Sequence, residues 1–167
     1  GRLLDYLSFY AGAWAVLKQL CGPQVLVVAK TDPPLVSVLA AQAVRRKGGI
    51  LVNWLQDLFP EVGALLGVRL LQGRLGRWLE RVRDASLRTA RTNVAIGERM
   101  AQRLVQRGIP ANQLEVIANW SDDQTVCPIA KSENPLIAEW DLQDKFVVMY
   151  SGNLGRAHEY TTLLNAA

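Results

Sequence analysis

Cysteine is scarce in this sequence, and its scarcity bears on the compartment. Among the 167 residues only Cys21 and Cys127 are cysteines, and they form no C-x-x-C pair. Small secreted scaffolds that depend on disulfides carry more cysteines at closer spacing. The usage therefore predicts two reduced thiols in a cytoplasmic protein, with a single disulfide between them as the alternative.

Long apolar runs are also missing, although 50% of the residues are hydrophobic and 20% are charged. No run approaches the ~18 residues that cross a bilayer, and the composition fits a soluble globular protein. Residues 1–20 look like a signal peptide, but Tyr6, Ser8, Tyr10 and Lys18 interrupt them and no cleavage site of small residues follows. Their spacing instead predicts a helix with one apolar face.

What the sequence does contain is a regular alternation of short apolar segments and helical segments. This rhythm predicts an α/β fold with a Rossmann-like parallel sheet and flanking helices, in which the first four strands are neighbours. The predicted strands are 24–30, 50–55, 92–97, 114–119 and 146–150. The predicted helices are 1–20, 35–46, which ends at Gly48-Gly49, a basic helix within 69–91, 98–106, 136–140 and 159–166.

Polar and turn-forming residues follow each predicted strand. The carboxyl ends of parallel strands meet at one edge of the sheet, where ligands bind, so these residues predict a cleft at that edge. Each loop alone is equally well explained as the turn that any strand needs, and the five together favour the cleft. The loops are Lys30–Pro34, Gln56–Asp57, Gly97–Glu98, Asn119–Asp122 and Ser151–Asn153.

Four stretches of the chain, taken in order, resemble a known family. They are TDPPL, NWLQDLFPE, NVAIGERMAQRLVQRGIPANQLEVIANWSD and YSGNLGRAHEY. Together they resemble bacterial glycosyltransferases of the retaining family 4, which have the two-domain GT-B architecture. The similarity is greatest to the colanic-acid and O-antigen type transferases of cell-envelope polysaccharide assembly. It runs along essentially the whole chain, and it rests on the ordered set of motifs because SGNLG alone is a weak signal.

The resemblance implies a domain organisation. Residues 1–127 are expected to form an incomplete N-terminal, acceptor-side domain, 128–144 a linker, and 145–167 the start of the nucleotide-sugar domain. A glycine-rich strand and loop would precede Gly1, and the paired-glutamate motif would follow Ala167, so the chain alone is expected to be inactive. One departure from the family is Ala118, which stands where a proline usually precedes Asn119 and loosens that turn.

The glycine loop after the fifth predicted strand is the candidate donor site. Glycine lets a backbone approach a phosphate, and a helix N-terminus supplies free N–H donors. The resemblance implies that Gly152, Asn153 and Gly155 face the donor diphosphate and that Arg156 pairs with it. A plain turn and a solvated arginine are the alternatives. His158, the single histidine, is expected to be a surface residue, because the family needs no enzymatic nucleophile or metal there.

Candidate residues on the acceptor side of the cleft lie in the loops of the first domain. They are Thr31, Asp32, Asp57, Glu98 and Asn119. Paired carboxylates such as Asp57 and Glu61 suit acid–base chemistry or sugar hydroxyls, and the resemblance favours acceptor or cleft-shaping contacts. For Glu61, a charge that complements the helix dipole is the favoured explanation. Asn53, inside an apolar strand, needs a buried partner such as a neighbouring loop and is not assigned to the site.

The segment 69–91 carries much of the basic charge, and its spacing predicts an amphipathic helix. Arg74, Arg77 and Arg81 form a candidate membrane surface, since basic residues bind anionic lipid. The alternative is an ordinary surface helix whose apolar side packs on the sheet. The hypothesis favoured here is that Leu65–Leu75 projects outward, because glycines interrupt it. Nucleic acid is not expected, since no aromatic residues interleave with the arginines.

The function predicted from these features is sugar transfer. A nucleotide-diphosphate-sugar donor would give its sugar to a lipid-linked glycan acceptor, with no cofactor and no metal. The enzyme would be peripheral at the inner face of the cytoplasmic membrane, and its main electrostatic task would be to stabilise the leaving diphosphate. A non-catalytic α/β module that binds a membrane surface or a protein partner is the alternative.

Overall fold

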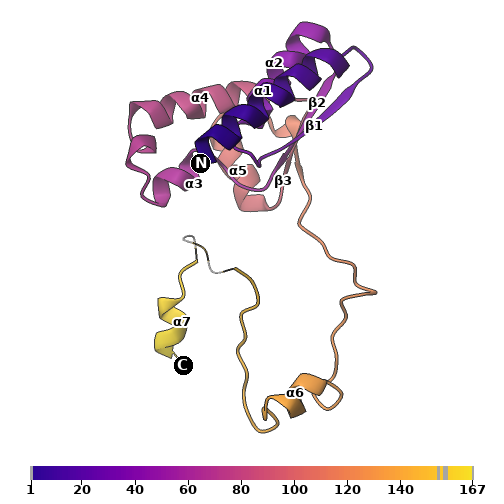
Figure 1. Ribbon diagram of the computed structural model, residues 1–167, viewed down its shortest axis with the longest axis vertical. Helices are drawn as coiled ribbons and strands as arrows, with labels where there is room; N and C mark the ends of the chain where they lie inside the picture. Colours follow the sequence, from indigo (N-terminus) through magenta and orange to yellow (C-terminus); the bar gives the residue numbers. More distant parts are fainter. Residues whose placement is uncertain (1, 154, 156–157, 167) are drawn as a thin grey trace. The chain divides into compact units, whose positions relative to one another are not determined.

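The fold consists of two compact units joined at residues 119 and 120. The computed structural model describes residues 2–153, 155 and 158–166 (Figure 1). Unit 1 comprises Gly1–Asn119 and unit 2 comprises Trp120–Ala167. Unit 1 contains the sheet and every buried hydrophobic side chain found in the described part of the chain. The predicted function of residues 145–167 as a nucleotide-sugar domain stays a prediction.

Unit 1 is built on a four-stranded parallel sheet. Its strands are β1 (Leu26–Lys30), β2 (Ile50–Leu55), β3 (Thr92–Ala95) and β4 (Leu114–Val116), and they pair in the order β1-β2-β3-β4. Val28 pairs with Val52, Asn53 with Asn93, and Ala95 with Val116. The predicted α/β fold and the parallel arrangement of the first four strands are therefore confirmed.

Helices connect and flank the strands. They are α1 (Arg2–Leu20), α2 (Val36–Lys47), α3 (Glu61–Leu65), η1 (Arg69–Leu71), α4 (Arg74–Thr89), α5 (Glu98–Gln106) and η2 (Ala111–Gln113). Helix α2 ends at Gly48 and Gly49, whose φ angles of 80° and 110° are unfavourable for other residues. A Cβ on Gly49 would lie 2.8 Å from Gly22 O, so glycine is also required for space.

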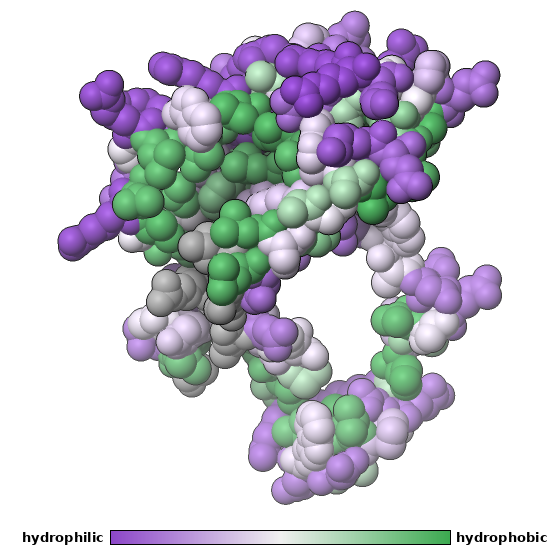
Figure 2. Space-filling view, turned by 45° about the horizontal axis from the view of Figure 1, so that its top comes forward, coloured by the Kyte–Doolittle hydropathy of each residue, from purple (hydrophilic) through white to green (hydrophobic). Residues whose placement is uncertain are grey.

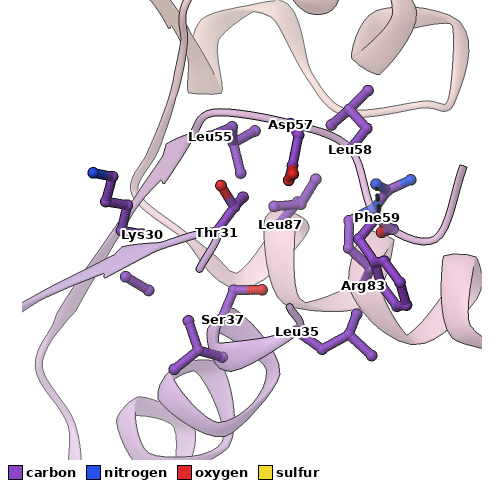
Figure 3. A pocket seen from close by; sticks show the side chains of 12 residues that line it. Lys30, Thr31, Leu35, Ser37, Leu55, Asp57, Leu58, Phe59, Arg83 and Leu87 are labelled. Atoms are coloured by element: carbon purple, nitrogen blue, oxygen red, sulfur yellow. Dashed lines mark hydrogen bonds between the residues drawn. The ribbon is translucent and has the colours of Figure 1, made fainter. Parts of the chain in front are cut away.

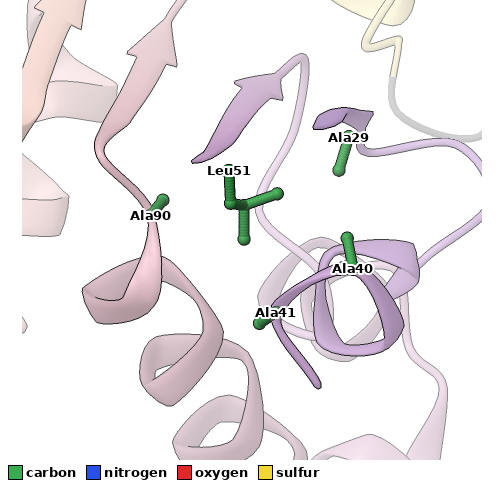
Figure 4. Close-up of a cluster of buried hydrophobic side chains, with 5 residues drawn as sticks. All are labelled: Ala29, Ala40, Ala41, Leu51 and Ala90. Carbon is green, nitrogen blue, oxygen red and sulfur yellow. The ribbon is translucent and has the colours of Figure 1, made fainter. Parts of the chain in front are cut away.

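Two apolar clusters attach the helices to one face of the sheet. In the first, Ala29 and Leu51 of the strands meet Ala40 and Ala41 of α2, with Ala90 beside them (Figure 4). The small alanine side chains let helix and sheet approach closely. In the second, Leu55 packs with three residues that are at most 1% exposed, which are Leu87 of α4, Leu104 of α5 and Ile109. Alternate strand residues such as Leu26, Val28 and Ile50 remain exposed.

A buried amide pair fixes the register between β2 and β3. Asn53 Nδ2 donates to Asn93 Oδ1 at 2.8 Å, and both side chains are fully buried. Asn93 in turn donates to Leu87 O at 3.1 Å and to Gln113 O at 3.3 Å. The partner of Asn53 is therefore a side chain of the neighbouring strand and not a loop as expected. A slip of one residue would leave these amides without partners, which is costly in a core.

Two predicted elements differ from the structure. The basic helix predicted within 69–91 is present as α4, but it begins only at Arg74, because the short helix η1 before it ends at Leu71. The predicted strand 146–150 is not formed, and the described part of unit 2 contains only the short helices α6 (Pro135–Glu139) and α7 (Thr161–Ala166). A strand needs a neighbour to accept and donate its hydrogen bonds, and that part of unit 2 offers none. Phe146 is accordingly 95% exposed.

The length and apolar character of the helices bear on whether one of them could cross a membrane. Over the described residues, none combines the length and the apolar character that crossing a bilayer requires.

Candidate functional site

A small pocket lies where β1 and β2 end, at the edge of the sheet where the sequence predicts a cleft. Its walls come from the loop after β1, the start of α2, the loop after β2, and α4 (Figure 3). Thr31, Ser37 and Asp57 supply its polar side chains, together with Lys30 and Arg83. Figure 3 shows Thr31 and Asp57 pointing toward one another across it. The pocket therefore presents a hydroxyl and a carboxylate against leucine and phenylalanine walls.

The carboxyl group of Asp57 has a perturbed acidity. Burial in the pocket wall raises its pKa, a hydrogen bond with Thr31 opposes this rise, and the nearby carboxylate of Asp32 adds to it. Desolvation disfavours the charged form, as does a like charge. Part of the Asp57 side chain remains open to solvent, so it can still meet a ligand. A perturbed carboxyl group in a pocket is a feature of functional sites.

The two loops that carry Thr31 and Asp57 are held together by hydrogen bonds. The backbone N–H of Gln56 donates to Thr31 Oγ1 at 3.0 Å. Beyond Asp57, Arg83 Nη1 donates to Phe59 O at 3.2 Å, so α4 anchors the loop from below. On the other side, the Tyr10 hydroxyl of α1 donates to Pro34 O. The pocket geometry therefore depends on residues from α1 and α4 as well as on its own loops.

A buried ion-pair network supports this anchor. Arg83 Nη2 lies 2.6 Å from Glu61 Oε1, and Arg83 Nε lies 2.7 Å from Asp84 Oδ1. Arg107, at the end of α5, reaches Asp84 at 2.8 Å and Glu80 at 3.0 Å. The network raises the pKa of Arg107, chiefly through the hydrogen bond to Asp84. It joins the loop after β2 to α4 and α5, and charges this buried persist only when they are paired.

Glu61 therefore has a structural partner. Its predicted role was a charge that complements the helix dipole, and the structure adds a bond to Arg83 from α4. Sequence analysis missed both Arg83 and Asp84 as supporting residues. The signal that could have found them is an adjacent pair of opposite charges on α4, one turn before the fully buried Leu87.

The remaining acceptor-side candidates differ in where they lie. Asp32 is exposed beside the pocket and acts on the pKa of Asp57. Asn119 reaches the same loop, because its Nδ2 donates to Gln56 Oε1 at 3.2 Å. Glu98 is exposed at the start of α5 and does not line the pocket. The structure thus brings Thr31 and Asp57 together, with Asp32 and Asn119 nearby, and leaves Glu98 apart.

The candidate donor loop lies in unit 2. Gly152 has a φ of 151°, and Tyr150 Oη donates to Asn153 O at 3.2 Å. The N–H of Gly155 donates to Nδ1 of His158 at 2.9 Å, and the other ring nitrogen lies 3.2 Å from Tyr150 Oη. His158 is exposed, as expected for a surface residue, and it also braces the loop. Arg156, the predicted partner of the diphosphate, lies outside the described residues.

Clusters of potential metal ligands are a further feature of a candidate site. Over the residues with described positions, there is no group of three or more histidine, cysteine, aspartate or glutamate side chains that could hold an ion. The prediction that the reaction needs no metal and no cofactor stays a prediction.

The parallel sheet with flanking helices and a pocket at its carboxyl edge defines a Rossmann-like α/β domain. Comparison with known families identifies which one. Residues 1–120 match the model of the "Glycosyl transferase 4-like domain", so the chain belongs to that family, whose members have GT-B architecture. The matched range covers the whole of unit 1, including the pocket and the ion-pair network.

One curated relative supports the assignment. The chain is 27% identical over 144 residues to "Probable glycosyltransferase WbjE" of Pseudomonas aeruginosa. The match covers 84% of this chain and 35% of that protein, so the chain spans about a third of the length of its relative. No solved structure matches the chain.

Proposed function

We propose that this chain forms the acceptor-side part of a glycosyltransferase that moves a sugar from a nucleotide-diphosphate sugar to a glycan. The observation that carries the proposal is the pocket of Thr31 and Asp57 at the carboxyl edge of the sheet, inside the range that matches the family. Ligands of such sheets bind at this edge. The named activity of the relative is consistent with it.

In this proposal Asp57 binds an acceptor hydroxyl. A carboxylate accepts hydrogen bonds from sugar hydroxyls, and Thr31 can both donate and accept. Leu58 and Phe59 in the same wall offer apolar surface to the less polar face of a sugar ring. Arg83 and Glu61 hold the loop in place and are positioning residues.

Gly152, Asn153 and Gly155 are proposed to face the donor diphosphate, with Arg156 as its cationic partner. Backbone N–H groups in a glycine loop bind phosphate oxygens, and an arginine gives paired hydrogen bonds. The leaving diphosphate gains negative charge in an oxocarbenium-like transition state, and these donors stabilise it without a metal or a cofactor. The sugar would be a hexose transferred with retention.

The acceptor is proposed to be lipid-linked, in cell-envelope polysaccharide assembly of the colanic-acid or O-antigen type. Such an acceptor is confined to the bilayer, so the enzyme would work as a peripheral protein at the inner face of the cytoplasmic membrane. The second candidate function is a non-catalytic α/β module. The observation that favours this module is the set of exposed arginines on α4, which could bind a partner without any sugar transfer.

The test uses a protein that carries this chain together with the sequence that follows residue 167 in its gene. It is incubated with radiolabelled nucleotide sugars and with membranes from its own host, and label is counted in the organic-solvent extract. The proposal expects label in the lipid fraction from one donor of the panel. The contrary result is a folded protein that incorporates label from none of the donors and whose gene encodes no nucleotide-sugar domain. That result would favour the non-catalytic module.

A further inference from the structure

The region formed by residues 61–82, which we call the elbow, projects from the end of unit 1 opposite to β1. It consists of α3, η1 and the first half of α4 (Figure 1). Its residues 62–79 include no aspartate or glutamate. The acids that flank this stretch, Glu61 and Glu80, are already paired with Arg83 and Arg107. The elbow therefore has no free negative charge to neutralise its cations.

Four exposed arginines belong to the elbow. They are Arg69, Arg74, Arg77 and Arg81. None of the side-chain hydrogen bonds or ion pairs of the described chain involves them. Their charges are thus available to an anionic partner, and each one beside an anionic bilayer strengthens binding.

Apolar side chains are exposed among these arginines. Leu65 is 86% exposed, Leu70 71% and Trp78 56%, and Leu66, Val68 and Leu75 are exposed to a smaller extent. Figure 2 shows hydrophobic surface next to hydrophilic projections at the side of unit 1 where α3 and the start of α4 lie. The alternative, in which the whole apolar side of α4 packs against the sheet, is not observed, because Leu75 and Trp78 remain exposed. An apolar patch beside basic residues is typical of membrane-surface segments.

The outward position of these side chains is built into the elbow. Leu71 packs inward between two glycines: a Cβ on Gly63 would lie 2.5 Å from Leu71 Cδ1, and one on Gly76 only 1.8 Å from Leu71 O. Gln72 Nε2 adds a bond to Ala64 O at 3.0 Å. Leu71 is partly buried by these contacts, whereas its neighbour Leu70 is 71% exposed. The elbow is therefore a folded wedge with an apolar tip, which needs no rearrangement before it binds.

We propose that the elbow inserts into the surface of an anionic lipid bilayer, with its leucines in the acyl boundary and its arginines among the headgroups. This inference rests on the proposed function, because it names the surface that meets the membrane of a lipid-linked acceptor. The charge of the elbow argues against a second copy of this chain as the partner. Two elbows in contact would bring four unpaired arginines against four others, which is repulsive. Anionic lipid supplies the opposite charge over the same area and accepts the leucines.

The experiment measures co-sedimentation of the 1–167 chain with vesicles. One set contains equal parts of phosphatidylcholine and phosphatidylglycerol and the other contains phosphatidylcholine alone, each at low and high salt. The variant R74E/R77E/R81E removes the cations, and L65S/L70S removes the apolar tip. The matched controls are R45E/K47E/R103E, which reverses as many exposed charges elsewhere on unit 1, and L4S/L20S, whose leucines are 68% and 64% exposed on α1. Circular dichroism verifies that each variant folds.

The wild-type chain and both controls are expected to pellet with the anionic vesicles. The elbow charge variant should bind at least about tenfold more weakly, and L65S/L70S should lose the binding that persists at high salt, because salt screens charges and not apolar contacts. Absence of pelleting by the wild type, or equal pelleting by elbow and control variants, would overturn the proposal. So would a dimer in sedimentation velocity that the elbow variants abolish. The same substitutions in the longer protein that carries this chain should leave sugar transfer to a detergent-soluble acceptor intact, which separates this inference from the proposed function.

Discussion

At the scale of single residues, the fold alters the acidity of Asp57 in the wall of the pocket. Burial in the pocket wall raises its pKa, and Asp32 adds to the rise. A carboxyl group whose pKa is higher in the folded than in the unfolded state favours folding when it is protonated. Above that pKa the ionised carboxylate of Asp57 lowers the stability of the folded state.

The variant Asp57→Asn should therefore be more stable than the wild type at neutral pH. The substitution removes the ionised carboxylate and keeps an acceptor for Thr31. The difference should shrink as the pH falls toward the ordinary value of 3.8 for an aspartate, because the wild-type carboxyl group then becomes protonated as well. Thermal unfolding across this pH range measures it. A destabilised variant at neutral pH, or a difference that grows in acid, would contradict the account.

Arg83 is the buried cation on which the pocket wall depends. Its guanidinium group bonds Phe59 O, Glu61 and Asp84, which belong to the loop after β2, to α3 and to α4. Removing one member of such a network leaves the others buried and uncompensated. Arg107 would still lie near Glu61 and Asp84, so it limits the loss of stability when Arg83 is removed.

Arg83→Met should lower the free energy of unfolding by about 3 kcal/mol. Arg81→Met, two residues earlier on the exposed side of α4, serves as the control and should change it by no more than ~0.5 kcal/mol. Urea denaturation of the two variants measures both effects. Similar free energies of unfolding for the two variants would show that the network does not stabilise the fold.

At the scale of elements, the four strands of unit 1 could be predicted to within a few residues, whereas β4 ends at Val116 and not at 119. Runs of valine, leucine and isoleucine between glycine and proline turns suffice for this. The ion-pair network could not be predicted, because Glu61, Arg83 and Arg107 are far apart in sequence. Thr31 and Asp57 were found because both directly follow strands. Glu98 also follows one, but it is not in the pocket.

The break between η1 and α4 depends on a close approach that composition does not reveal. The glycines of this region suggested an interrupted helix, and the structure shows that Gly76 is required where Leu71 O would meet a side chain. The helical period predicts a basic helix within residues 69–91 but does not give the residue at which it begins. The tertiary contact determines that residue, and it produces the wedge that carries the exposed leucines.

Gly76→Ala should therefore destabilise unit 1 by about 1–3 kcal/mol, since its methyl group would overlap Leu71 O and the backbone must shift. Gly73→Ala is the matched control. It has open space around its Cβ position and a φ of −112°, and should change stability by no more than ~0.5 kcal/mol. Equal effects of the two substitutions in denaturant unfolding would refute the close packing of the elbow.

At the scale of the whole molecule, the apolar core of the described chain is confined to unit 1. Its last fully buried hydrophobic residue is Ile109, and unit 2 contains none among its described residues. Exposed apolar side chains such as Phe146 and Val148 follow instead. The stability of the chain should therefore come from unit 1.

A polypeptide of residues 1–119 should consequently fold alone and unfold at the same urea concentration as 1–167. Every cluster of buried hydrophobic residues in the described structure is retained in it. The comparison uses far-ultraviolet circular dichroism, with the slope of the transition as a measure of the surface exposed. A lower midpoint for 1–119 would mean that unit 2 contributes to the stability of unit 1.

The central claim is that the pocket of unit 1 binds the acceptor of a sugar transfer, and steady-state kinetics test it most directly. The assay uses the protein that carries this chain, with donor and acceptor varied in turn. Asp57→Asn should raise the KM for the acceptor about tenfold or more, because one charged hydrogen bond is lost. The KM for the donor should stay unchanged. Unchanged constants for both substrates, or a higher KM for the donor alone, would contradict the account.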